Sequence, residues 1–175
     1  MRKLKNNKGI VFWITGLSGS GKTTIAKKIT PEIKKLFGPT IIISGDDLRK
    51  IFKFKGYTSS ERLELGYRYS NLLKYFSNQK INVVFAVIGL FNKLRSYNKK
   101  TLKNYVEIYL KTNIKNLTKF SKKKHYRQNH KFVWGKDLKA EFPKNPDIVI
   151  KNDFYKSTDE ISKTIMKKIK KIAFK

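Results

Sequence analysis

The sequence predicts an α/β fold, with a parallel five-stranded sheet and helices on both of its faces. Short apolar runs with the length of buried strands alternate with longer stretches in which apolar residues recur every three or four positions. The first apolar run ends in a loop rich in glycine and serine, and this loop leads directly into such a helical stretch. At 175 residues the chain has the length of one domain, so we expect residues 1–175 to form a single domain.

The predicted strands are nearly continuous apolar runs, which is typical of a sheet covered on both faces. They are residues 10–15, 40–44, 81–88, 106–110 and 147–150. Helices are expected between and after them, at residues 24–37, 59–78, 92–104, 113–121 and 159–172. Because strand–helix–strand connections of this kind are right-handed crossovers, the strands are expected to run parallel.

Four local features qualify this outline. Pro31 is expected to bend or interrupt the first helix. Residues 45–49 follow the second strand and are expected to form a loop, and Ser59 or Ser60 is expected to cap the helix after it. Residues 122–144 are basic and poor in aliphatic side chains, which predicts a long surface loop.

The last helix, at about residues 157–173, has isoleucines on one face and lysines on the other. The isoleucine stripe predicts that this helix packs on the sheet. A membrane-surface helix is the alternative that the lysines leave open.

Composition excludes several classes of protein. There is no cysteine, which excludes a disulfide framework, a thiolate zinc site and a cysteine nucleophile. The longest apolar stretch, residues 81–91, is shorter than the roughly 20 residues that span a membrane. The apolar run at residues 10–14 is too short for a signal-peptide core. We therefore expect a soluble cytoplasmic protein.

The net charge is +29, from 41 Lys and Arg against 12 Asp and Glu. Such a field attracts nucleic acid, anionic membranes and phosphorylated ligands. Only six of the 41 basic residues are arginine, and Asn, Ile, Phe and Tyr are also abundant, as A+T-rich codons would produce. The lysine excess is therefore either a compositional bias or a dedicated polyanion surface, and clustering on one face would distinguish them.

The motif with the most specific chemistry is Gly16-Leu-Ser-Gly-Ser-Gly-Lys-Thr23, which matches the P-loop pattern G-x-x-x-x-G-K-[ST] without a mismatch. Gly19 and Gly21 let the backbone turn its amides toward a phosphate, and the following helix adds its dipole. Lys22 places a positive charge on the β- and γ-phosphates, and the Thr23 hydroxyl binds Mg²⁺. The fold class is therefore that of P-loop NTPases and kinases.

The remaining sequence favours a kinase among P-loop proteins. The strand at residues 81–88 has no acidic residue, so a Walker B carboxylate is not visible there, and no N-K-x-D motif of GTPases is present. Asp46 and Asp47 follow the second strand, where small metabolite kinases place the carboxylate that receives the proton of the acceptor hydroxyl. A solvated turn is the alternative interpretation of this pair.

An ordered set of motifs over roughly residues 9–152 resembles the adenylylsulfate (APS) kinase family. The matching segments are the phosphate loop at residues 16–24, Ser44-Gly-Asp-Asp-Leu-Arg49, Gly56-Tyr-Thr-Ser-Ser-Glu-Arg62, Ile88-Gly-Leu-Phe91, Lys123 with Tyr126, and Asn145-Pro-Asp147. The resemblance implies that ATP, with Mg²⁺, phosphorylates the ribose 3′-hydroxyl of a 5′-activated nucleotide. Adenylyl sulfate is the acceptor expected first, which would place the protein in sulfate assimilation.

The resemblance also assigns roles to single residues. ATP would be bound by Gly16, Ser18, Gly19, Ser20, Gly21, Lys22, Thr23 and Thr24. Lys22 and Asp46 would be catalytic, and Thr23 and Asp46 would hold Mg²⁺, Asp46 through water. The acceptor would be bound by Arg49, Tyr57, Arg62, Ile88, Phe91, Lys123 and Tyr126. Residues 119–144 would form a lid over the phosphates, and the family often forms homodimers.

The acceptor side departs from the family pattern at several positions. Where the family has polar or charged residues, this chain has Ser44, Leu65, Gly89, Asn92, Phe120 and Ser121. Leu90 and Phe91 instead resemble a variant of the family that acts on cytidine diphosphoramidate and is associated with surface-polysaccharide modification. The same phosphoryl transfer to a cytidine nucleotide is therefore the first alternative, and a degenerate P-loop domain that binds nucleic acid is the second.

Overall fold

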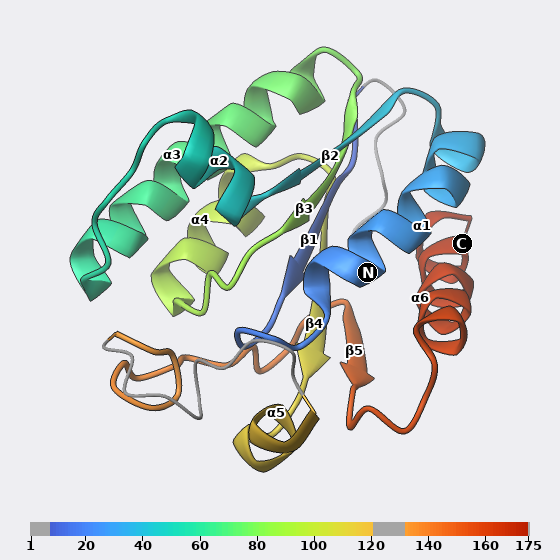
Figure 1. Cartoon of the computed structure of the whole chain (residues 1–175). Coiled ribbons are helices and arrows are strands. Elements are labelled where there is room, and N and C mark those ends of the chain that lie inside the picture. Colours follow the sequence, from blue (N-terminus) through green and yellow to red (C-terminus); the bar gives the residue numbers. More distant parts are fainter. Residues whose placement is uncertain (1–7, 121–131, 175) are drawn as a thin grey trace.

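The computed structural model describes residues 8–120 and 132–174 (Figure 1). Five strands form one parallel sheet, as the sequence predicted. Their order in the sheet is β2-β3-β1-β4-β5. The strands are β1 (Val11–Thr15), β2 (Thr40–Ser44), β3 (Asn82–Ala86), β4 (Tyr105–Lys111) and β5 (Ile148–Lys151).

Helices cover both faces of the sheet (Figure 1). α1 (Lys22–Phe37) and α6 (Thr158–Ala173) pack together on one face, and α3 (Ser59–Asn78) and α4 (Asn92–Thr101) lie on the other. Two short helices, α2 (Gly45–Ile51) and α5 (Ile114–Phe120), follow the carboxyl ends of β2 and β4. None of the helices in the described ranges is long and apolar enough to cross a membrane.

Alternate side chains of β1 enter two separate cores. Phe12 and Ile14 belong to the core beneath α1 and α6, where the isoleucine stripe of α6 packs as predicted. Val11 and Trp13 belong to the core beneath α3 and α4, where the ring of Trp13 lies 5.0 Å from that of Phe85. All four side chains are completely buried, which explains why β1 has no polar alternation.

Three local predictions were wrong. Of the two effects expected of Pro31, the interruption does not occur: α1 begins earlier than expected, at Lys22, and runs through the proline to Phe37, and a bend at Pro31 stays a prediction. The expected loop after β2 is the helix α2, which Ser44 caps. The cap of α3 is Thr58, one residue before the expected Ser59 or Ser60, and Glu61 completes its capping box.

The strand order places the phosphate loop at a change of direction in the chain. β1 lies between β3 and β4. The connection from β1 runs past β3 to β2, whereas the connection from β3 runs in the opposite direction, past β1, to β4. In an open parallel sheet, ligands bind beyond the carboxyl ends of the strands at such a point. The loops after all five strands therefore meet at the edge where the phosphate loop lies.

Candidate active site

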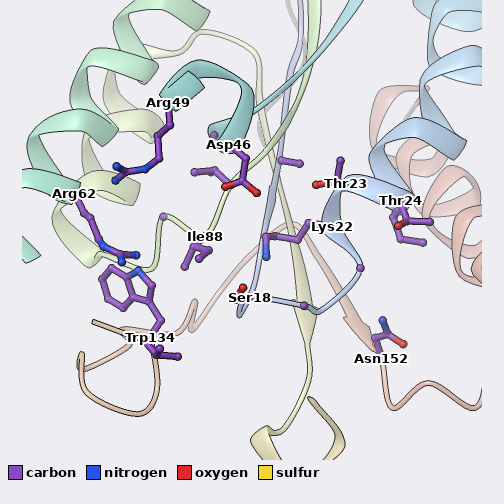
Figure 2. Close-up of a pocket in the computed structure, with 18 of the residues that line it drawn as sticks. Ser18, Lys22, Thr23, Thr24, Asp46, Arg49, Arg62, Ile88, Trp134 and Asn152 are labelled. Atoms are coloured by element: carbon purple, nitrogen blue, oxygen red, sulfur yellow. The ribbon is translucent and has the colours of Figure 1, made fainter. Parts of the chain in front are cut away.

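A cavity of about 1,090 Å³ opens at this edge of the sheet. The phosphate loop and the start of α1 form one wall, and α2 with the start of α3 forms the facing wall. Segments after β3 and β5, and residues 132–134, close the remaining sides. Figure 2 shows the principal side chains converging on this space.

The phosphate loop has the backbone geometry that its glycines predict. Gly19 and Gly21 have φ angles of 77° and 87°, in the left-handed region that favours glycine. Gly21 caps α1 without a side-chain hydrogen bond, and the first turn of α1 holds no acidic residue. The amides at the start of α1 therefore face the loop with the positive end of the helix dipole, which suits an anion.

Lys22, Thr23 and Thr24 begin α1 and line the cavity together with Ser18, Gly19 and Gly21. Lys22 is largely buried, and its ammonium donates to the carbonyl of Leu17 at 2.6 Å. Two predicted residues of the loop, Gly16 and Ser20, do not line the cavity. They shape the loop instead, since a Cβ at Gly16 would lie 2.7 Å from the carbonyl oxygen of Leu110 and 2.9 Å from Ser20 Oγ.

Asn152 fastens the phosphate loop to the end of β5, a role that the sequence analysis missed. Its side-chain amide donates to the carbonyl of Ser20 at 3.0 Å, and its Oδ1 accepts from the backbone of Phe154 at 3.2 Å. Both polar ends of this buried side chain are therefore used to join two loops that line the cavity.

Asp46 faces the phosphate loop from α2. The neighbouring Asp47 forms the capping box with Ser44, so its carboxylate is held at the start of the helix. Asp46 lines the cavity, and Figure 2 shows its carboxylate pointing toward Thr23, with Lys22 between the two walls. The two adjacent aspartates therefore have different surroundings.

The oxygen atoms of Thr23 and Asp46 fit a magnesium site that phosphates complete. Mg²⁺ in nucleotide sites is bound by one or two protein oxygens, with phosphate and water as the other ligands. Within the described residues there is no group of three or more His, Cys, Asp and Glu side chains that could hold a metal without phosphate. The donor set is thus one that suits Mg²⁺ bound together with a nucleotide.

Two arginines and one tyrosine form a stack on the facing wall. The guanidinium carbons of Arg49 and Arg62 lie 4.6 Å and 5.3 Å from the centre of the Tyr57 ring. Arg49 also donates to the carbonyl of Gly56 at 2.8 Å, and Arg62 donates to the carbonyl of Tyr57 at 2.8 Å. Burial, and then the charge of Arg49, lower the pKa of Arg62. Two close positive charges on one wall favour an anionic ligand.

Trp134 extends this stack and is a second residue that the sequence analysis missed. Its ring lies 5.8 Å from the guanidinium of Arg62 and 4.7 Å, edge to face, from the ring of Phe91. Arg62 also donates to the carbonyl of Phe132 at 2.9 Å, which holds this segment against α3. The aromatic side chains and the arginines thus line the same side of the cavity.

The segment after β3 forms the floor between the two walls. Ile88, Gly89 and Phe91 line the cavity. The hydroxyl of Thr15, at the end of β1, donates to the carbonyl of Ile88. This bond joins the floor to the strand that leads into the phosphate loop.

Other residues named from the sequence fall into three groups by their place in the structure. Leu65 is buried in the core beneath α3 and α4, so it presents no group to the cavity. Phe120 lines the cavity, with its ring 5.9 Å from that of Phe154. Lys123, Tyr126 and Ser121 lie outside the described residues.

Comparisons with known proteins agree with this geometry. The family model described as adenylylsulphate kinase matches residues 8–151. The cytidine diphosphoramidate kinase of Campylobacter jejuni subsp. jejuni serotype O:2 is 33% identical, over 95% of this chain and 99% of its own length. The adenylyl-sulfate kinase of Clostridium acetobutylicum is 32% identical, over 90% of this chain and 81% of its own length.

Solved structures show the same fold. The Mycobacterium tuberculosis APS kinase CysC, in complex with AMPPNP and APS, superposes with a TM-score of 0.83 at 22% identity, over 93% of this chain and 98% of that one. A gluconokinase from Sinorhizobium meliloti superposes with a TM-score of 0.62. The resemblance seen in the sequence motifs is therefore confirmed over most of the chain, and the protein belongs to the adenylylsulphate kinase family.

Proposed function

We propose that this protein is a kinase that transfers the γ-phosphoryl group of ATP to the ribose 3′-hydroxyl of a 5′-activated nucleotide. The observation that supports it best is the arrangement of one cavity: a phosphate loop on one wall, and Asp46 with an arginine–aromatic stack on the other. Family membership and relatives named for activated nucleotides support the same reaction.

The donor nucleotide is assigned to the phosphate-loop wall. The amides at the start of α1 and the ammonium of Lys22 bind the phosphates and stabilise the charge that develops during transfer. Thr23 and Asp46 would hold Mg²⁺, which neutralises the phosphate oxygens when bound. Phosphoryl transfer depends mainly on such positioning and electrostatic stabilisation.

The acceptor is assigned to the facing wall. Asp46 orients the acceptor hydroxyl and accepts its proton. Arg49 and Arg62 bind the anionic 5′ group, since guanidinium groups match such oxygens in a bidentate way. Tyr57, Phe91 and Trp134 enclose the nucleoside, and Ile88 lies beneath it. The described residues of the predicted lid are 119–120 and 132–144, and four of them line this cavity. A lid movement and a homodimer stay predictions.

Two acceptors follow from these observations. Adenylyl sulfate is the acceptor for which the family is named. Cytidine diphosphoramidate is the second candidate, because the relative named for it aligns over 99% of its length at 33% identity. The apolar residues Leu65 and Gly89, at positions where the resemblance leads us to expect polar groups, also favour an altered acceptor.

The test is a measurement of ADP release with Mg-ATP and each acceptor in turn, with the phosphorylated product identified by mass. Transfer to adenylyl sulfate alone or to cytidine diphosphoramidate alone selects that acceptor. Absence of transfer to either one, in protein that still binds ATP, would contradict the proposed function and favour the degenerate P-loop domain.

Lys22→Ala is the matching loss-of-function variant. We expect it to lower turnover by about a thousandfold, the size of effect found when a main electrostatic stabiliser of the transition state is removed. Lys27→Ala is the control, since Lys27 is an exposed lysine of the same helix outside the cavity. Equal turnover in the two variants would contradict the role of Lys22.

A further inference from the structure

A buried ion pair lies behind the acceptor side of the cavity. Glu107 on β4 is completely buried, and Arg95 on α4 is 6% exposed. Arg95 Nε lies 3.9 Å from Glu107 Oε1. Within the described residues neither carboxylate oxygen of Glu107 has a hydrogen-bond partner. A pair buried in this way is a poor source of stability, because two apolar side chains of similar size would cost less to bury.

A chain of hydrogen bonds leads from this pair to the floor of the cavity. The guanidinium of Arg95 donates to Oδ1 of Asn92, and the backbone amide of Asn92 donates to the carboxylate of Glu141 at 2.5 Å. The backbone amide of Glu141 donates in turn to the carbonyl of Leu90 at 3.0 Å. The start of α4, the end of the loop at 132–141 and the floor segment are thus joined through the partners of Arg95.

The floor segment is the part of the cavity that these bonds reach. Ile88, Gly89 and Phe91 line the cavity directly. Phe91 also contacts Trp134, which stacks on Arg62. A shift of this segment would therefore move the aromatic wall as well, whereas the phosphate loop is fastened separately through Asn152.

We propose that Arg95 and Glu107 are positioning residues, which hold the floor segment 88–91 in the geometry that the acceptor nucleotide requires. Their assignment to the acceptor rests on the proposed function. The geometric part, that the pair holds the segment in place, does not depend on it. Neither residue touches the proposed reacting groups, so their effect passes through Asn92 and Glu141.

The charge state of Glu107 gives this arrangement a dependence on pH. The groups that face it are Arg95 and Lys99 of α4, Tyr105 on the same strand and Asp147 ahead of β5. Burial raises the pKa of Glu107 to about 7, against the attraction of Arg95 and Lys99. Glu107 is therefore mostly ionised at pH 8, half ionised near pH 7 and mostly neutral at pH 6, so the ion pair weakens as the pH falls through 7.

The first experiment uses Glu107→Gln, which keeps the shape of the side chain and removes its charge. With adenylyl sulfate or cytidine diphosphoramidate as the varied acceptor, we expect the acceptor KM at pH 8 to rise about tenfold, as for a displaced binding group, with the KM for ATP unchanged. In the unmodified protein the acceptor KM should rise from pH 8 to pH 6, and in the variant this dependence should disappear. Glu64→Gln, at an exposed ion pair on α3, is the control.

The second experiment needs no turnover. Hydrogen exchange of the backbone amides of Asn92 and Glu141 is measured in both proteins at pH 8, with amides of α1 as the reference. We expect faster exchange in Glu107→Gln at these two amides alone. Unchanged exchange there would overturn the proposal, and so would an unchanged acceptor KM. Absence of turnover in the unmodified protein would overturn the proposed function, and the exchange rates would still decide whether the pair holds the segment.

Discussion

Gly89 is a departure from the family pattern that the packing around it explains. Its φ angle is 46°, and a Cβ there would lie 2.9 Å from Cζ2 of Trp13 and 3.3 Å from Cγ1 of Val87. The resemblance described above implies a polar side chain at this position in the family, but here the indole of Trp13 occupies the space that a side chain needs. The glycine is thus matched to a large core residue on β1 as well as to the cavity that it lines.

Gly89→Ser should therefore not restore a family-like site. We expect it to destabilise the fold by about 1–3 kcal/mol, the usual cost of overpacking, and to raise the acceptor KM. Urea denaturation and steady-state kinetics measure the two effects. In a background of Trp13→Phe, which removes the ring atom in contact, the serine should cost less. If Gly89→Ser were as stable as the original protein, Trp13 would have to move away from the new side chain without a loss of stability, which would contradict this prediction.

At the scale of elements, α2 determines where Asp46 lies. Ser44 and Asp47 close a capping box at its start, with the Ser44 hydroxyl 2.7 Å from the Asp47 carboxylate. Ser44 is buried and does not line the cavity. It therefore acts on the site through the helix that it caps.

Ser44→Asp tests this function of the helix start. It replaces a hydrogen bond with two carboxylates in contact, so we expect a loss of stability of about 1–2 kcal/mol and a lower turnover, as Asp46 is displaced. The double variant Ser44→Asp with Asp47→Asn restores a donor and should recover both. Thermal unfolding and ADP release provide the measurements. Higher turnover in the single variant would mean that an aspartate at position 44 contributes directly to the reaction.

The sequence predicted the strands and the large helices because their apolar periodicity reflects burial on one face or two. It missed α2, since Gly45-Asp-Asp contains residues of low helix propensity and seven residues are too few to show a period. The spacing Ser44-x-x-Asp47 is the one local signal that could have indicated a helix start there.

The residues of the candidate site also differ in whether the sequence could reveal them. The phosphate loop, Asp46 and the two arginines belong to motifs with fixed local spacing, so they could be found in the sequence. Trp134 and Asn152 could not be found in this way, because each belongs to a segment without a motif. Long-range ring contacts and hydrogen bonds bring them to the cavity.

At the scale of the whole molecule, the charge of +29 is distributed widely. Within residues 8–120 and 132–174, exposed lysines lie on every helix, including α1 and α6 on one face of the sheet and α3 and α4 on the other. This distribution favours a compositional origin of the lysine excess over a single dedicated polyanion surface, and so it does not favour the nucleic-acid alternative.

Unfolding of the whole molecule should report the titration of Glu107. Its pKa is raised to about 7 in the folded protein, from 4.5, so the folded state binds the proton more tightly than the unfolded state. The contribution of Glu107 to the free energy of unfolding therefore falls by up to about 3 kcal/mol as the pH rises from 4.5 to 7. Above pH 7 this contribution is constant. Urea denaturation of the original protein and Glu107→Gln from pH 5 to 8 should show the two curves diverging, whereas parallel curves would contradict a raised pKa.

The two tryptophans of the chain occupy places that make them separate optical reporters. Both belong to the core beneath α3 and α4. Trp13 lies wholly inside it, whereas Trp134, 2% exposed, also lines the cavity against Phe91 and Arg62. We therefore expect the emission of both to follow the integrity of this core, and that of Trp134 to respond in addition to a ligand in the cavity that it lines. Each tryptophan can be replaced by phenylalanine in turn, so nucleotide binding and unfolding can be followed in the same molecule without an added dye.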